Sequence, residues 1–117
     1  MRPFRNLIAW QKAHDLTLDI WKATAAFPAE ERFVLVPQMR RAARSIPANL
    51  AEGSGRRTTR AFVHYVDIAC GSSSELEYDL FLSRELGIME ATRHADLHQR
   101  VVEVRKMMLG LARPGGP

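Results

Sequence analysis

The chain has 117 residues, of which 46% are hydrophobic and 26% are charged. A chain of this length forms one domain and can bury about two-thirds of its unfolded surface without a metal or disulfide. The composition excludes a disordered chain, and no apolar run reaches the ~18–20 residues of a membrane span. Cys70 is the single cysteine, and Lys12 interrupts the apolar stretch behind Arg2 and Arg5 where a signal peptide would continue. We therefore expect a cytoplasmic protein.

The charges are segregated along the chain. Residues 32–60 contain seven arginines against one acid, a net +6, whereas residues 61–96 contain two bases against seven acids, a net −5. Either these segments neutralise each other across a helix pair or a subunit contact, or the basic segment faces a polyanion. Arginine suits both uses because its planar guanidinium binds carboxylate and phosphate bidentately.

The first predicted helix spans about residues 7–26. Its apolar positions recur at spacings of four and three residues: Ala9, Ala13, Leu16, Ile20, Ala23 and Phe27. A neighbouring stripe holds Trp10 and Trp21, so the buried face is wider than a two-stranded coiled-coil seam. Pro28 ends this helix, and a connector over residues 29–36 has room for one helical turn.

The second predicted helix spans residues 37–53, with Pro37 at its first position, where a missing N–H costs nothing. Pro47 lies inside the apolar pattern and removes the bond to the Ala43 carbonyl, so we expect it to kink the helix without ending it. Gly53 and Gly55 are the expected stop.

The third and fourth predicted helices span residues 58–86 and 90–111. Thr58 or Thr59 is the expected N-cap of the third, and Leu86-Gly87 its C-cap. Small residues centred on Gly71 would let another backbone approach it closely. Residues 113–117 are expected to be disordered. Because no segment alternates like a strand, the sequence predicts one all-α domain over residues 1–112, an antiparallel up-and-down four-helix bundle.

Six arginines are the candidate nucleic-acid-binding residues: Arg40, Arg41, Arg44, Arg56, Arg57 and Arg60. The first three share an arc of about 100° on the second helix, on the side away from its apolar line. They either track phosphates or pair with Glu75, Glu77 and Asp79 of the third helix or of a neighbouring subunit. For the other three we favour contact with an anion, because they lie in and just after an exposed glycine-rich loop that leads into a helix N-terminus.

Other polar groups indicate structure more than chemistry. Ser45, Asn49 and Glu52 form a strip on the second helix, and Ser72, Glu75 and Asp79 share a face of the third. We interpret both as hydrogen-bonded, packed or ion-paired contacts at a helix or subunit interface, because no nucleophile accompanies the strip. His94 and His98 are four residues apart but lack a third ligand at a recognisable spacing, and no Glu-x-x-His motif is present. We expect no catalytic site, metal or cofactor.

Several segments, in order and over about residues 4–89, resemble the four-helix bundle family of 23S ribosomal RNA intervening-sequence proteins. They are Phe4-Arg5-Asn6-Leu7, Trp10-Gln11-Lys12-Ala13, Phe27-Pro28, Gln38 to Ile46, Asn49 to Gly53, Ala69 to Ser72 and Ser74 to Glu77. The resemblance implies a small bacterial protein that assembles as a ring-shaped homopentamer, with no established enzymatic activity. A relative, the accessory protein of diversity-generating retroelements, partners a reverse transcriptase and binds nucleic acid.

Three hypotheses follow. The leading one is a non-catalytic homo-oligomer that binds nucleic acid, RNA in the first place, through the arginines of the second helix and the following loop. The second is an adaptor ring that docks a partner protein, with the basic and acidic segments complementary across subunits. A hydrolase or metal enzyme ranks last.

Overall fold

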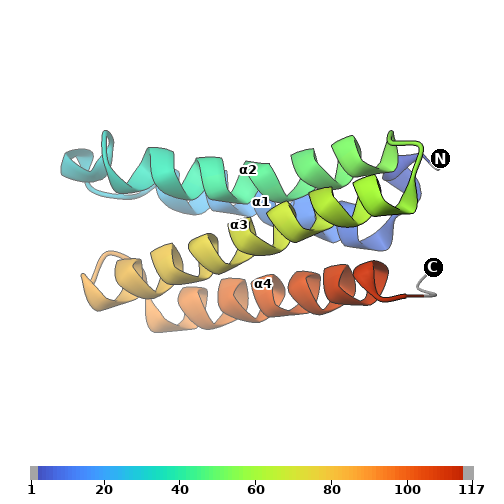
Figure 1. The fold of residues 1–117 in the computed structure, drawn as a ribbon. Helices are drawn as coiled ribbons and strands as arrows, with labels where there is room; N and C mark the ends of the chain where they lie inside the picture. The colour runs from blue at the N-terminus through green and yellow to red at the C-terminus, as the bar shows by residue number, and fades with distance from the viewer. Residues whose placement is uncertain (1–2, 115–117) are drawn as a thin grey trace.

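The structure, a computed structural model, describes residues 3–114. Within this range it contains helices and no strand. The elements are η1 (Phe4–Asn6), α1 (Ile8–Ala25), η2 (Ala29–Glu31), α2 (Leu35–Ser54), α3 (Thr59–Glu85) and α4 (Ala91–Ala112). Successive α-helices run in opposite directions (Figure 1), so the predicted all-α, up-and-down arrangement is confirmed for the described chain.

Each helix packs against two neighbours. α1 and α3 both contact α2 and α4, and the contact between α2 and α3 is the most extensive. The predicted apolar lines meet in one core, whose fully buried side chains include Leu16, Ile20, Met39, Ile46, Leu50, Leu76, Leu80, Leu97, Val101 and Met108. None of the helices in residues 3–114 combines the length and apolar character of a bilayer span.

Pro47 is accommodated inside α2 by a side chain of α1. Proline has no N–H, so the Ala43 carbonyl lacks its usual donor four residues later. The Thr17 hydroxyl lies 3.1 Å from this carbonyl and 2.8 Å from that of Ala13, and its single proton is shared between them. α2 therefore continues through Pro47, as the periodicity predicts.

The start of α2 differs from the prediction. The helix begins at Leu35, two residues earlier than expected, and Pro37 occupies the third position instead of the first. The N–H groups of the whole first turn lack intrahelical acceptors, so proline is tolerated throughout it. α2 ends at Ser54, between the two glycines that were predicted to stop it.

Both ends of α3 carry the predicted caps. The Thr58 hydroxyl accepts a hydrogen bond from the Ala61 N–H at 3.1 Å. At the other end Gly87 has φ +76°, and the N–H groups of Gly87 and Ile88 donate to the carbonyls of Arg84 and Ser83 at 2.9 and 3.0 Å. This pair of bonds is a Schellman motif, for which glycine is the favoured residue. Of the expected disordered tail, residues 115–117 lie outside the described range.

Candidate nucleic-acid interface

The three arginines of α2 do not behave alike. Arg41 and Arg44 are exposed, but Arg40 is half-buried and turned toward the end of α1. Its Nε donates to the Thr24 hydroxyl at 2.9 Å and its Nη2 to the Trp21 carbonyl at 3.2 Å. The guanidinium carbon also lies 5.1 Å from the centre of the Trp21 ring. The expectation of one open arc shared by three guanidinium groups is therefore wrong for Arg40, which ties α2 to α1.

The predicted ion pairs between α2 and α3 are not formed among the described residues of the protomer. Glu77 instead accepts a hydrogen bond from Arg105 of α4 at 2.6 Å. Neither Arg41 nor Arg44 has a carboxylate within ion-pair distance in residues 3–114. Pairing with a neighbouring subunit stays a prediction.

Two of the three arginines in and just after the loop between α2 and α3 are open to solvent, whereas the third is bound by neighbouring side chains. Arg56 pairs with Glu52 at 2.7 Å, donates to the Tyr65 hydroxyl at 2.9 Å and lies over the Tyr65 ring. Arg57 and Arg60 are exposed, and in the described chain no carboxylate pairs with either. Thr58 caps α3 between them, so the first N–H groups of that helix open beside Arg57 and Arg60.

The fold adds further cations to this end of the bundle. The N-terminal segment, the α2–α3 loop and the last turns of α4 all lie at the same end (Figure 1). We define the basic end as the five exposed cations there that have no carboxylate partner in residues 3–114: Arg5, Arg57, Arg60, Lys106 and Arg113. Glu52 and Glu103, acids of the same region, are paired with Arg56 and Lys12. Sequence reasoning missed three of the five, because they come from segments far apart in the chain.

The polar strip of α2 forms part of the contact with α3. The Ser45 and Ser72 hydroxyl oxygens are 2.7 Å apart, and the Asn49 amide donates to the Ser45 carbonyl at 2.8 Å. Glu52, the third member of the strip, is exposed and pairs with Arg56. The expected hydrogen-bonded seam is thus present for Ser45, Asn49 and Ser72, inside one protomer.

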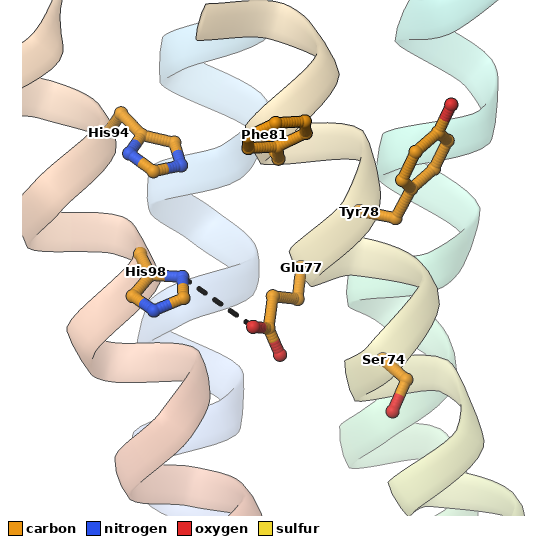
Figure 2. Close-up of a pocket in the computed structure, with 6 residues that line it drawn as sticks. All are labelled: Ser74, Glu77, Tyr78, Phe81, His94 and His98. Atoms are coloured by element: carbon orange, nitrogen blue, oxygen red, sulfur yellow. Dashed lines mark ion pairs between the residues drawn. The ribbon is translucent and has the colours of Figure 1, made fainter.

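A groove of about 300 Å³ between α3 and α4 contains the two histidines (Figure 2). The rings of His94 and His98 are stacked with centres 5.6 Å apart, and His98 Nδ1 is 3.8 Å from a Glu77 carboxylate oxygen. Burial, and then the charges of Arg84 and His98, lower the pKa of His94. No set of three ligating His, Cys, Asp or Glu side chains converges within residues 3–114. This groove therefore offers a metal two imidazoles and no complete ligand set.

Two other titratable groups lie at helix contacts. Asp79 is only 7% exposed, and within residues 3–114 its Oδ2 has no hydrogen-bond partner. Burial, and then the charge of Glu75, raise the pKa of Asp79 to about 6. The Cys70 thiol is half-buried against the core, and burial raises its pKa, so it is a poor nucleophile.

The sequence profile of 23S rRNA-intervening sequence proteins matches residues 5–110. The chain belongs to this family. The match extends into α4, beyond the stretch of about residues 4–89 that carries the resemblance in the sequence. No match is found among curated proteins.

A solved structure has the same fold. It is the crystal structure of a protein of unknown function from the S23 ribosomal protein family of Bacteroides thetaiotaomicron, with a TM-score of 0.83 and 20% sequence identity. The alignment covers 92% of this chain and 100% of that one. At this identity the likeness establishes the bundle fold alone.

Proposed function

We propose that this chain is a non-catalytic, cytoplasmic homo-oligomer that binds nucleic acid, RNA in the first place, through the basic end of the bundle. The observation that carries the proposal is the gathering of unpaired cations at that end, with Arg57 and Arg60 beside the open N-terminus of α3. Guanidinium groups and helix N-termini are the usual partners of phosphate oxygens.

The geometry favours the loop arginines over those of α2 as the primary contacts. Arg40 already uses its donors on α1, and Arg56 is partly neutralised by Glu52. Arg57 and Arg60 project from a loop and a first helical turn, where several phosphates can reach them without a change in the bundle. Arg41 and Arg44 lie farther along α2 and would extend the contact if they remain free after assembly.

Oligomerisation is the second part of the proposal. The family resemblance implies a ring of five subunits, and a ring would present several basic ends to one polynucleotide. Linked sites of this kind raise avidity steeply even when each site is weak. The family name makes a fragment of 23S ribosomal RNA the natural first probe.

Charge reversal at the loop tests this function. In fluorescence anisotropy at 50 mM salt with a labelled ribosomal RNA fragment, Arg57→Glu together with Arg60→Glu should weaken binding at least roughly tenfold. Arg56→Gln is the matched control, because its guanidinium is already occupied by Glu52 and Tyr65, and we expect a smaller effect. Both variants should keep the helical circular dichroism of the parent chain.

The outcome also separates RNA binding from an adaptor role. Lost RNA binding with intact assembly supports the proposal, whereas lost assembly assigns the loop arginines to a subunit contact. A parent chain that binds no RNA at 50 mM salt would overturn the nucleic-acid function and favour the adaptor ring.

A further inference from the structure

The outward side of α3 carries a surface that no other part of the described chain covers. Tyr78 is 59% exposed and Ile68 is 40% exposed. With Gly71 and Glu75 they fall within an arc of about 80° on the helix, and we call these four residues the α3 face. A Cβ placed on Gly71 would meet no atom within 4 Å, so nothing in the described protomer requires glycine there. Glycine weakens a helix interior, so its presence fits close approach by a separate molecule.

The acids beside this face lack a cation. Glu75 is exposed and Asp79, one turn later, is buried, and neither forms an ion pair within residues 3–114. Asp79 Oδ2 has no hydrogen-bond partner among the described residues. Two carboxylates a turn apart repel each other, and a buried one gains from any positive charge brought near it. The edge of the α3 face thus carries two carboxyl groups, those of Glu75 and Asp79, that no cation within residues 3–114 neutralises.

The complementary cations belong to α2. Arg41 and Arg44 are exposed and have no carboxylate partner in the described residues. The 2.7 Å contact between the Ser45 and Ser72 hydroxyls fixes the register of the antiparallel helices. It brings Arg41 and Arg44 level with Glu75 along the bundle axis, although they form no pair with it inside the molecule. Any rotation about an axis parallel to the helices preserves this height, so a neighbouring copy would present its two arginines level with Glu75.

We propose that the α3 face docks a second copy of this chain. Arg41 and Arg44 of that copy pair with Glu75, next to the buried Asp79. The proposal rests on the self-association part of the proposed function and is independent of RNA binding. It assigns Arg41 and Arg44 to assembly and leaves Arg57 and Arg60 for the polyanion. Tyr78 and Ile68 supply the apolar contact, and Gly71 lets the incoming helix approach closely.

A charge swap tests the pairing by analytical ultracentrifugation of the full chain. Glu75→Arg should weaken self-association at least roughly tenfold, and so should Arg41→Glu combined with Arg44→Glu. The variant with all three substitutions should recover most of the lost affinity, because it restores opposite charges across the contact. Recovery supports the proposal. A parent chain that sediments as a monomer at ~100 μM overturns it and leaves the face to a different protein, and single-side variants that assemble like the parent overturn it as well.

A glycine substitution separates docking from folding. Gly71→Gln should raise the melting temperature of the dilute monomer, because an exposed helix interior prefers glutamine, yet weaken self-association at least roughly tenfold. Gly110→Gln is the matched control, since a Cβ at Gly110 in α4 also meets no atom within 4 Å, and it should leave assembly unchanged. Equal association of the two glutamine variants would overturn the placement of the contact on α3.

RNA binding, by fluorescence anisotropy, and assembly, by analytical ultracentrifugation, are measured separately on the same variants. The Arg57→Glu, Arg60→Glu variant should assemble like the parent chain while losing RNA, and the Glu75→Arg variant should lose assembly. If the loop variant alone fails to assemble, the contact lies at the basic end and the present proposal is overturned. Absence of RNA binding in an assembled parent chain overturns only the nucleic-acid function.

Discussion

Asp79 and Arg40 show what residue spacing can and cannot predict. The helical angle places Asp79 on one face with Ser72 and Glu75, and packing or ion pairing was the expected role. The Ser72 hydroxyl does contact that of Ser45, but Asp79 is buried and no cation of the described chain pairs with it. Likewise the angle of Arg40 says nothing about how far its side chain bends, and the carbonyl of Trp21 at the end of α1 attracts it. Spacing predicts which side chains share a face of a helix. The contacts with the neighbouring helix determine which of those side chains are buried and what they pair with.

Replacing Asp79 with asparagine should stabilise the protein at pH 8 and have little effect at pH 4. The folded-state pKa of Asp79 is about 6, above its ordinary value of 3.8, so the fold favours the protonated acid. Stability from this group is present at low pH and is lost as the pH rises from about 4 through about 6. Asparagine removes the cost of the buried charge, which we expect to be about 1–2 kcal/mol at pH 8.

Urea denaturation of the monomer at the two pH values measures this difference. Asp67→Asn is the control, because Asp67 is exposed and the same substitution there removes no buried charge. An Asp79→Asn variant that is less stable than the parent at pH 8 would contradict the burial argument.

At the scale of the helix, the apolar periodicity predicted the elements well and their ends less well. The caps of α3 were found because threonine and glycine have specific roles at helix termini. The start of α2 was missed by two residues because proline fits anywhere in a first turn. Gly53 was interpreted as a stop, but it lies inside α2, where a Cβ would come within 3.0 Å of the Tyr65 Cβ in α3. A close helix contact and a helix end favour the same residue, and only the packing separates them.

Gly53→Ala should therefore destabilise the bundle by about 1–2 kcal/mol, since an added methyl group forces α2 and α3 apart. Gly55→Ala is the matched control: its φ of −83° suits alanine, and its nearest neighbour would lie at 3.6 Å. Alanine at residue 55 should leave stability unchanged or raise it slightly. Thermal unfolding of the two variants measures the contrast, and equal melting temperatures would show that the helices can separate at no cost.

At the scale of the whole molecule, the segregation of charge along the chain is only part of the pattern. The sequence shows a basic segment and an acidic segment, but not that Arg5, Lys106 and Arg113 join the loop arginines. That requires the topology, which brings the first residues, the middle loop and the last helix to one end (Figure 1). A list of arginines near one another in sequence therefore included Arg40, which is engaged elsewhere, and omitted three cations that share the basic end.

RNA affinity should fall steeply with salt if the basic end is the contact. Neutralising about four to six phosphates per site releases the same number of counterions, so raising salt from 50 to 200 mM should weaken binding roughly 10²–10³-fold. Anisotropy titrations at four salt concentrations give the slope. The Arg57→Glu, Arg60→Glu variant should show a shallower slope, and a parent chain with no salt dependence would exclude a phosphate contact.

Because the bundle is elongated, the position of the basic end affects how the molecule is oriented when it approaches a polyanion. The molecule measures 44 × 23 × 19 Å, and the five cations of the basic end lie at one tip of the long axis. Because antiparallel helices largely cancel one another's dipoles, this lopsided charge dominates the torque that a distant polyanion exerts. The bundle would therefore rotate as it approaches the polyanion, and the basic end would make the first contact.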